Sequence, residues 1–466
     1  MPVCGRLNVA KFCAVALFLL MPCALQAMDA VTLDVSLVDK GRALEGRAAF
    51  TIVNDTGAPL EHVSFWLYPN RFAKGWKRPR EHEVEWLYPR GKSEGRMTLH
   101  AVEVDGVPLS DEGVSLRSFR EPGQAALTSD LLADIRLPAP LAAGQSVRID
   151  TRFRVTIPLR RGRFGRHGGV ISLCGGFYPI PVDRQPDGLS RVPPSLDTTL
   201  RVRVPAGLGL VSADGFALPG QGGSIATFHA VDSDVPLIFM DRMTVTQDAK
   251  EGVDIVHIMR DHRPAAADFL DRIGRAMDIA GGVLGAHLAQ GGHLPGRLIL
   301  VEIPAFDRLV QLSGSTVIMS RQIWRLAPLE KARLFHDLTL ARSVGAALSL
   351  PDARRKESPG NAELVAETAG CITADLWLQA ERRQQQSVSD LVRFASFIPY
   401  VDNLIYAPQI PFEHAYTAST EEPDALRDEL WRFNNELPRG RRIATRLEDR
   451  IGKAQTRRLM KGWHEE

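Results

Sequence analysis

The periodicity of the apolar residues changes once along this chain, near Gly252, and that change constrains the fold more than any other feature. Between Val31 and about Met243, apolar and polar residues alternate over short runs, as is typical of half-buried β-strands. The clearest runs are 33–37, 49–53, 63–67 and 147–155, and turn signals separate them at 54–57 and 105–108. The pattern predicts an antiparallel β-sandwich, with one short helical turn at 128–136.

Beyond Gly252 the pattern becomes mainly helical. A strand-like segment at 253–257 precedes apolar residues that recur three and four positions apart from Phe269 to Ala280, which predicts an amphipathic helix. Further expected elements are buried strands at 298–301 and 316–319, a helix at 329–348 and a charged helical tail at 424–463. We therefore predict a β-sandwich domain at 28–250 and a mostly helical domain at 251–466.

The size and charge of the chain fit this division. Its 466 residues exceed the usual length of a single domain, which favours two domains. Hydrophobic residues make up 44% and charged residues 24%, the proportions of a globular protein with a full core. The net charge of +2 is too balanced for a nucleic-acid-binding protein, so we expect no nucleic-acid partner.

The first residues have the order of a secretory signal. Arg6 and Lys11 precede an apolar run at 12–25, and the small residue Ala27 follows it. This order predicts a signal peptide at 1–27 with cleavage after Ala27, and an uncleaved anchor is the alternative. No later run reaches the ~18 apolar residues that a spanning helix needs. We expect a periplasmic or secreted protein that is not an integral membrane protein after signal removal.

Two cysteines remain after this signal, Cys174 and Cys371. Export permits a disulfide bond, but two cysteines this far apart in a large chain do not form a disulfide framework. We expect two separately buried thiols, because an unpaired cysteine behaves as a small hydrophobic residue. A bridge that staples the two domains is the alternative.

Two basic segments, 74–80 and 160–167, stand out in the first half. Both contain several arginines or lysines, at least one glycine and an aromatic residue. They are either a patch for an anionic partner or solvated hairpin tips. We favour solvated tips, because the rest of this half is not basic.

The segment His336-Asp337-Leu338-Thr339-Leu340, followed by Glu367, has the outline of a zinc-binding helix pair. An intact H-E-x-x-H motif holds zinc with two histidines on one helix face and uses the glutamate as general base. Here Leu340 takes the place of the second histidine and Asp337 that of the glutamate. A catalytic zinc usually has three protein ligands, so His336 and Glu367 are one ligand short.

Other residues could complete such a site. Glu363 lies one helical turn before Glu367 and shares its face, so His336, Glu363 and Glu367 form a conceivable set that suits a harder ion than zinc. Asp337, Asp375 and His414 are further candidates. The alternative is a helix pair whose polar residues satisfy one another. The remaining histidines with no ligand spacing are expected in surface or loop positions: His257, His262, His287 and His293.

Six segments in order resemble the aminopeptidase N-like zinc peptidases, a gluzincin family. They are 65–70, 175–179, 200–207, 300–304, the helix around His336, and 364–367. The resemblance implies an N-terminal β-sandwich followed by a thermolysin-like, mostly helical α/β domain of the catalytic type. It places His336 at the first zinc-ligating histidine, Asp337 at the general base and Glu367 at the third ligand. The longer spacing to Glu367 is attributed to a loop insertion at 352–360.

Two further features of the family are changed in this chain. The strand that binds the amino terminus of the substrate corresponds to Gly314-Ser315-Thr316-Val317-Ile318, which contains no carboxylate. The family tyrosine that stabilises the oxyanion corresponds to Leu437, which has no hydrogen-bond donor in its side chain. The substrate cleft is therefore expected at Gly314, Ser315 and Thr316, without its original chemistry.

These losses predict a catalytically inactive, aminopeptidase-like envelope protein that binds a peptide or an unknown protein partner and has no cofactor. The alternative is an active metallopeptidase whose zinc site is rebuilt on His336, Glu367 and one of Glu363, Asp337 or His414. A third possibility is a purely structural partner of a membrane complex.

Overall fold

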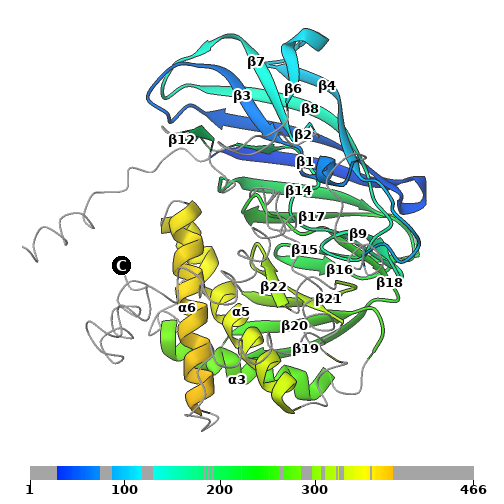
Figure 1. Cartoon of the computed structure of the whole chain (residues 1–466), viewed down its shortest axis with the longest axis vertical. Coiled ribbons are helices and arrows are strands. Elements are labelled where there is room, and N and C mark those ends of the chain that lie inside the picture. The colour runs from blue at the N-terminus through cyan, green and yellow to red at the C-terminus, as the bar shows by residue number, and fades with distance from the viewer. Residues whose placement is uncertain are drawn as a thin grey trace, which may run out of the picture.

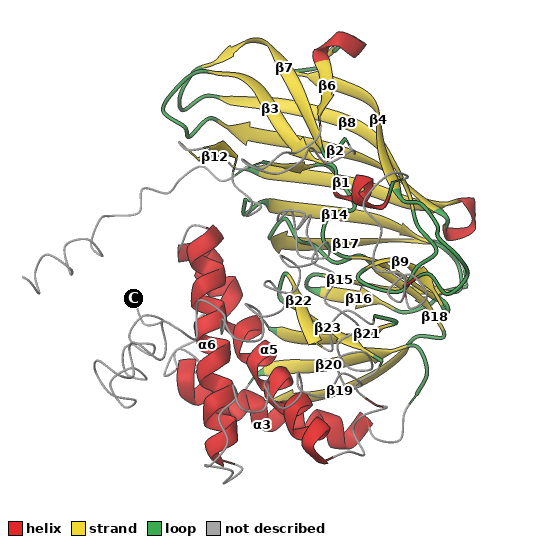
Figure 2. Cartoon of the chain, in the orientation of Figure 1, coloured by secondary structure: helices red, strands yellow, loops and turns green. Residues whose placement is uncertain are grey.

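The computed structural model describes residues 29–73, 87–117, 130–182, 184–185, 188–189, 194–221, 223–250, 252–262, 266–284, 296–305, 310–321, 324, 330–356 and 359–380. In this part of the chain, β-sheets follow one another along the long axis of the molecule. Three α-helices pack beside the last sheet (Figure 1; Figure 2).

The first sheet has seven strands in the order β17-β14-β1-β2-β8-β4-β5. Its bounds are β1 Ala30–Val38, β2 Ala43–Val53, β4 Arg96–Val104, β5 Val107–Pro108, β8 Ser146–Thr156, β14 Asp197–Val204 and β17 Ser224–Val231. Successive side chains of β1 lie on opposite faces of the sheet. Val31, Leu33 and Val35 are buried, and the polar residues between them point outward. The turn between β4 and β5 uses Asp105 and Gly106, both with positive φ, as a tight hairpin requires.

Two smaller sheets enclose the core of this part. One has the order β11-β3-β7-β6, with β3 Leu60–Trp66, β6 Val114–Arg117, β7 Leu132–Leu141 and β11 Ile180–Pro181. The other has the order β16-β15-β18-β10-β9, with β9 Phe164–His167, β10 Val170–Leu173, β15 Leu208–Ser212, β16 Gly215–Ala217 and β18 Ile238–Asp241. A separate pair joins β12 Arg184–Gln185 to β13 Gly188–Leu189. Phe50, Phe65, Phe153 and Phe239 lie in one shared core, so the first part is rich in sheet, as predicted. The prediction that its strands are all antiparallel is wrong, because β1 pairs with β14 in parallel.

One prediction in this part is wrong. Residues 132–136, expected to be helical, belong to strand β7, which pairs with β3 and with β6. Leu132, Ala133 and Ile135 are buried there, so pairing and burial on both sides outweigh the local helical pattern.

The last sheet has the order β19-β20-β21-β23-β22, and β20, β21 and β23 are mutually parallel. Its bounds are β19 Thr244–Lys250, β20 Val253–Met259, β21 Arg297–Ile303, β22 Val310–Ser313 and β23 Thr316–Ser320. Val256 and Ile299 on one face pack against Val211 and Met240 of the preceding sheet. Both faces of this sheet are therefore covered, which explains its nearly continuous apolar strands.

Helices α3 Ala266–Leu284 and α5 Glu330–Lys356 lie against the other face, and α6 Pro359–Ala380 packs on both of these helices. Phe269 and Ile273 of α3 share a core with Leu298 and Leu300 of β21. The predicted excess of helix in the second part is not supported, because the described residues combine three helices with this five-stranded sheet. The predicted tail helix at 424–463 lies outside the described residues.

The loop insertion expected at 352–360 is also wrong. Helix α5 continues through Pro351 to Lys356, and α6 begins at Pro359. Ala353 is fully buried and Arg354 forms an ion pair with Asp232, so tertiary contacts extend the helix past its proline.

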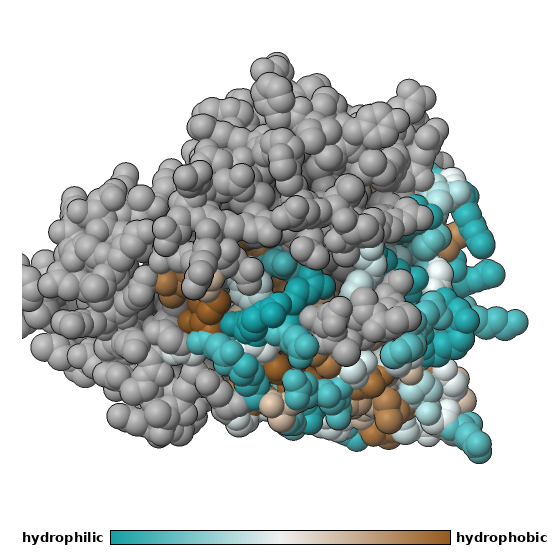
Figure 3. Space-filling model, turned by 90° about the horizontal axis from the view of Figure 1, so that it is seen from below, coloured by the Kyte–Doolittle hydropathy of each residue, from teal (hydrophilic) through white to brown (hydrophobic). Residues whose placement is uncertain are grey.

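Among the described residues, no helix is long and apolar enough to cross a membrane. On the lower face of the molecule, hydrophilic and hydrophobic side chains of the described residues lie interleaved (Figure 3). The predicted signal segment at 1–27 and the basic segment at 74–80 lie outside the described residues. Cys174 and Cys371 are two separately buried thiols, as expected.

Candidate functional site

The α5–α6 hairpin carries the predicted metal ligands, and glycines fix its register. A Cβ atom on Gly345 would lie 3.1 Å from Gly370 Cα, and one on Gly370 would lie 2.4 Å from the Arg342 carbonyl oxygen. The two antiparallel helices therefore cross with their backbones in close approach at Gly345 and Gly370. Neither position has room for a side chain.

Gly370→Ala is expected to lower the free energy of unfolding by about 2 kcal/mol, because the new methyl group meets a backbone oxygen that cannot rotate away. Urea denaturation of both proteins measures the change. The control is Gly296→Ala, whose new methyl group would meet no atom within 4 Å, so stability should change little. Gly57→Ala does not serve as a control, because Gly57 has a positive φ. Equal losses at Gly370 and Gly296 would contradict the close helix crossing.

The hairpin register separates His336 from Glu367. His336 lies nine residues before Gly345, away from the bend, whereas Glu367 lies three residues before Gly370, toward the bend. With a rise of 1.5 Å per residue, their backbones are offset by roughly 18 Å along the helix axes. Glu363 lies another turn toward the bend. The structure thus brings Glu363 and Glu367 onto one helix but holds both far from His336.

The other two positions of the motif serve packing and charge pairing. Asp337 Oδ1 accepts a hydrogen bond from Arg272 Nη1 of α3 at 2.6 Å, and both side chains are mostly buried. Arg272 also stacks over the ring of Phe269. Leu340 is 2% exposed and lies in the core between the helices and the sheet. The carboxylate at the general-base position is therefore neutralised, and the second ligand position is inside the core.

The backbone offset between His336 and Glu367 does not fit one zinc ion held by both residues. A zinc site needs nitrogen, sulfur or carboxylate ligands within about 2.0–2.3 Å of one point. Within the described side chains, no group of three or more His, Cys, Asp or Glu residues is arranged to hold a metal. Glu367 is half-buried and makes no hydrogen bond or ion pair with the described residues.

The predicted cleft segment forms a turn. Gly314, with φ 54°, and Ser315 connect β22 to β23, and Thr316 begins β23. A Cβ atom on Gly314 would lie 3.2 Å from Asp232 Oδ2. Carboxylates therefore do lie beside this segment, although they come from the loop after β17 and were not found in the sequence.

Asp232 and Asp234 anchor a polar network between the two parts of the chain. Asp234 accepts hydrogen bonds from Gly175 N at 2.9 Å, Ser313 Oγ at 2.9 Å and Arg163 Nη2 at 3.0 Å. Asp232 pairs with Arg354 Nη1 of α5 at 2.8 Å, with both side chains less than 10% exposed. Burial raises the pKa of Asp232, and the positive charge of Arg354 opposes that shift. The network thus pairs the two carboxylates with Arg163 and Arg354.

Cys174 lies next to this network but is unreactive in character. Its Sγ is 3.5 Å from Ser172 Oγ, and burial raises the pKa of the thiol to about 11. A thiol with a raised pKa is rarely ionised near neutral pH and is a poor nucleophile.

The buried pair of His257 and Glu302 was not predicted from the sequence. His257 Nε2 of β20 lies 3.3 Å from Glu302 Oε1 of β21, and these side chains are 0% and 1% exposed. Trp324 Nε1 donates to Glu302 at 2.6 Å. The expected surface or loop position of His257 is therefore wrong. The polar side chain of His257 between the apolar residues Val256 and Ile258 was the signal that could have shown this.

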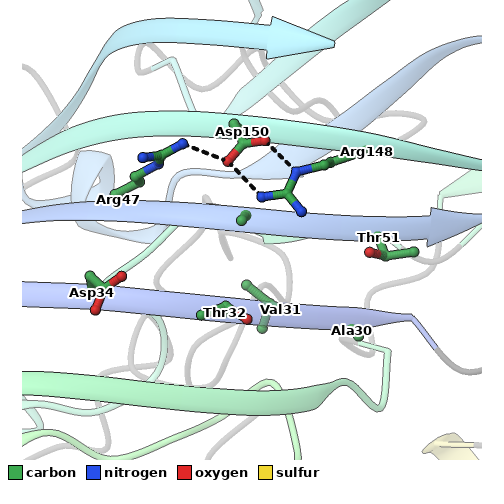
Figure 4. A pocket seen from close by; sticks show the side chains of 9 residues that line it. Ala30, Val31, Thr32, Asp34, Arg47, Thr51, Arg148 and Asp150 are labelled. Atoms are coloured by element: carbon green, nitrogen blue, oxygen red, sulfur yellow. Dashed lines mark hydrogen bonds and ion pairs between the residues drawn. The ribbon is translucent and has the colours of Figure 1, made fainter. Parts of the chain in front are cut away.

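A hollow of about 310 Å³ lies on the outer face of the seven-stranded sheet, remote from α5 and α6. Asp150 of β8 lies at one side of it and pairs with Arg47 at 3.2 Å and with Arg148 at 2.7 Å (Figure 4). The hydrogen bond from Arg148 is the main cause of the lowered pKa of Asp150. The two arginines outnumber the single carboxylate of Asp150, so these three side chains carry one net positive charge.

No protein-family model matches the chain, and no curated protein matches it. Solved structures similar to it include a mutant of the M1 zinc metallopeptidase from Deinococcus radiodurans, at 14% identity and a TM-score of 0.45, covering 93% of this chain and 94% of that one. The unmutated enzyme matches at 14% identity and a TM-score of 0.44, with 94% of each chain covered. These similar structures are M1 zinc metallopeptidases. An aminopeptidase N family protein from Idiomarina loihiensis matches at 9% identity and a TM-score of 0.39, over 69% of this chain and 48% of that one.

Proposed function

We propose that this chain is an exported, aminopeptidase-like protein that does not hydrolyse peptides and binds a peptide or protein partner in the cell envelope. The observation that carries the proposal is the ion pair between Asp337 and Arg272 at 2.6 Å. A general base must reach the proton that it removes, and this carboxylate is held by a guanidinium instead. The burial of Leu340 and the offset of His336 from Glu367 support the same conclusion.

We further propose that the molecule consists of a β-sandwich domain and a thermolysin-like domain, near the predicted ranges 28–250 and 251–466. Strand β19 begins at Thr244 and pairs along its whole length with β20, which supports a boundary close to Arg242. The signal at 1–27 supports export to the periplasm or beyond. In this proposal the two domains hold a partner segment and need no cofactor.

Protein purified without chelator is expected to contain far less than one zinc per chain and to release no product from a panel of aminoacyl and peptide substrates. The physical reason is that the motif positions are occupied by a paired carboxylate and a buried leucine. Elemental analysis and a fluorogenic peptide assay provide the measurements. His336→Ala and Glu367→Ala are the matched variants, and both should give the same traces as the wild type.

Stoichiometric zinc that a chelator removes together with peptidase activity would overturn the proposal. It would favour an active metallopeptidase with a rebuilt site. The half-buried Glu367, which makes no bond with the described residues, is the observation that favours this second candidate. Loss of both zinc and activity in His336→Ala and Glu367→Ala would then identify the two ligands.

A further inference from the structure

Arginines of the first part of the chain lie in two different environments. Arg160 and Arg163 are buried and bind within the protein, to the Phe164 carbonyl and to Asp234. The expectation of a solvated hairpin tip at 160–167 is therefore wrong for these two residues. Other arginines are exposed on the outer face of the seven-stranded sheet, and two of them line the hollow of about 310 Å³.

Small side chains on two neighbouring strands form the floor of this hollow. Thr51 of β2 lies opposite Ala30 of β1, and both line it. Thr32 of β1 and Ala49 of β2 form the next opposed pair. Because all four side chains are short, the longer ones beside them stand above the sheet and enclose a space (Figure 4). The floor therefore offers two hydroxyl groups between two methyl groups.

Asp150 of β8 holds the two arginines at the edge of the hollow, and we call these three residues the arginine rim. Asp150 Oδ2 accepts a hydrogen bond from Arg148 Nε at 2.7 Å, and Oδ1 accepts one from Arg148 Nη2 at 3.3 Å. The same Oδ1 accepts from Arg47 Nη2 at 3.2 Å. The Asp150 side chain is 9% exposed, whereas those of Arg47 and Arg148 are 54% and 59% exposed. A nearly buried carboxylate thus fixes two exposed guanidinium groups (Figure 4).

The main effect of these contacts is on the geometry of the donors. Ion pairs with an exposed partner contribute little to the stability of a fold. Donors that are already held in place, however, lower the entropy cost of binding a ligand. Asp150 uses neither Nε and Nη1 of Arg47 nor Nη1 of Arg148. The arginine rim therefore keeps preorganised donors beside the hydroxyl groups of the floor.

Among the described residues, no second carboxylate pairs with the arginine rim. The pKa of Arg148 is raised by its hydrogen bond to Asp150 and by the charge of that carboxylate, and no other described charge adds to the shift. Asp34, the other carboxylate that lines the hollow, pairs with Arg201 of β14 at 3.4 Å. The rim thus keeps its one net positive charge, which a ligand with a single carboxylate complements.

We propose that this hollow binds a small sugar acid, a ligand with one carboxylate and several hydroxyl groups. The carboxylate accepts hydrogen bonds from Arg47 and Arg148, whose planar, forked donors match its two oxygens. Thr32 and Thr51 exchange hydrogen bonds with the hydroxyl groups. A volume of about 310 Å³ is at the small end of the range for ligand sites, which favours a single sugar unit. The hollow is remote from α5 and α6, so this binding is independent of the proposed function.

Titration calorimetry of the full chain tests this binding with D-galacturonate and D-glucuronate as probes. At least one of the two acids should bind. Its neutral counterpart, D-galactose or D-glucose, has no carboxylate and should bind at least about tenfold more weakly, the effect of losing a charge-assisted hydrogen bond. Absence of binding by both acids, or equal affinities for an acid and its neutral sugar, would overturn the proposal.

A carboxylate can also come from a peptide or an amino-acid derivative, which lacks the hydroxyl groups of a sugar. N-acetylalanine represents this source and should bind more weakly than the sugar acid, because it cannot use the hydroxyl groups of Thr32 and Thr51. Equal or tighter binding of N-acetylalanine would show that the hollow does not select a sugar acid.

Substitutions in the arginine rim locate the binding. Arg47→Gln and Arg148→Gln should each weaken binding of the sugar acid about tenfold. The matched control is Arg203→Gln, because Arg203 of β14 is exposed on the same face of the sheet but does not line the hollow. It should bind the acid as the wild type does, and thermal denaturation checks that all variants remain folded. Equal affinities of Arg148→Gln and Arg203→Gln would place the ligand elsewhere.

Asp150→Asn separates positioning from simple charge attraction. If only net charge mattered, removal of this negative charge would strengthen the binding of an acid. Because Asp150 positions both guanidinium groups and asparagine keeps only one acceptor oxygen, we expect weaker binding instead. An unchanged or higher affinity of Asp150→Asn would show that Asp150 is not a positioning residue.

Discussion

Arg354→Met is expected to lower the free energy of unfolding by about 4 kcal/mol, the typical cost of removing one partner from a buried ion pair. Arg354 Nη1 lies 2.8 Å from Asp232 Oδ1, and both side chains are almost fully buried. Without the guanidinium, Asp232 either stays charged and unpaired or becomes protonated. Chemical denaturation monitored by circular dichroism measures the loss.

The loss should depend on pH in a defined direction. The pKa of Asp232 is already raised by burial, and removal of the opposing charge of Arg354 raises it further. Ionising a carboxyl whose pKa is raised in the folded state costs stability as the pH rises through the shifted range. The deficit of Arg354→Met relative to the wild type should therefore be largest near neutral pH and should shrink in acid.

Two controls isolate the buried pair. Arg201 forms an exposed pair with Asp34 at 3.4 Å, so Arg201→Met should cost no more than about 1 kcal/mol. Combining Asp232→Asn with Arg354→Met should recover part of the loss, because no buried charge is left unpaired. Equal costs at Arg354 and Arg201 would show that the pair between the two parts of the chain is not formed in solution.

Leu340→His, which would restore the outline of the zinc motif, is expected to lower the free energy of unfolding by about 3 kcal/mol and to create no metal site. Leu340 is 2% exposed in a core that contains Leu338 and Val344. An imidazole there loses its water and gains no described partner of suitable geometry. The backbone of Glu367 is also too far from this part of α5 to complete a site.

Urea denaturation with and without added zinc checks this second expectation. Leu340→Met is the matched control and should cost less than about 1.5 kcal/mol, because it keeps the side chain apolar and of similar volume. Stabilisation of Leu340→His by zinc would contradict the helix register described above. Stability equal to that of Leu340→Met would contradict the burial of this position.

The sequence predicted a helix or strand correctly where one periodicity of apolar residues extended over the whole segment. The alternation over residues 33–37 predicted part of β1, and the three and four residue spacing from Phe269 to Ala280 predicted α3. Its predictions of secondary structure were wrong where tertiary contacts outweighed the local preference of the chain. Strand β7 forms because two neighbouring strands bury its apolar residues, and α5 continues past Pro351 because Arg354 reaches Asp232.

The candidate site shows the same division. The sequence identified His336, Asp337, Leu340 and Glu367 as related positions because their spacing resembles a known motif. It could not show that Arg272 neutralises Asp337, because these residues are 65 positions apart and belong to different helices. Nor could it show the pairing of His257 with Glu302, which depends on the register of two parallel strands.

The sequence by itself determined the strand periodicity of the first part, the amphipathic helix from Phe269 to Ala280 and the loss of the second histidine, because periodicity and residue identity are local properties. Only the tertiary structure decided how far His336 lies from Glu367, since that offset follows from a helix crossing at Gly345 and Gly370. It also decided which arginines are buried in ion pairs, as Arg163 is with Asp234. Contacts between segments distant in the chain depend on the packing of the whole fold, and no local pattern encodes them.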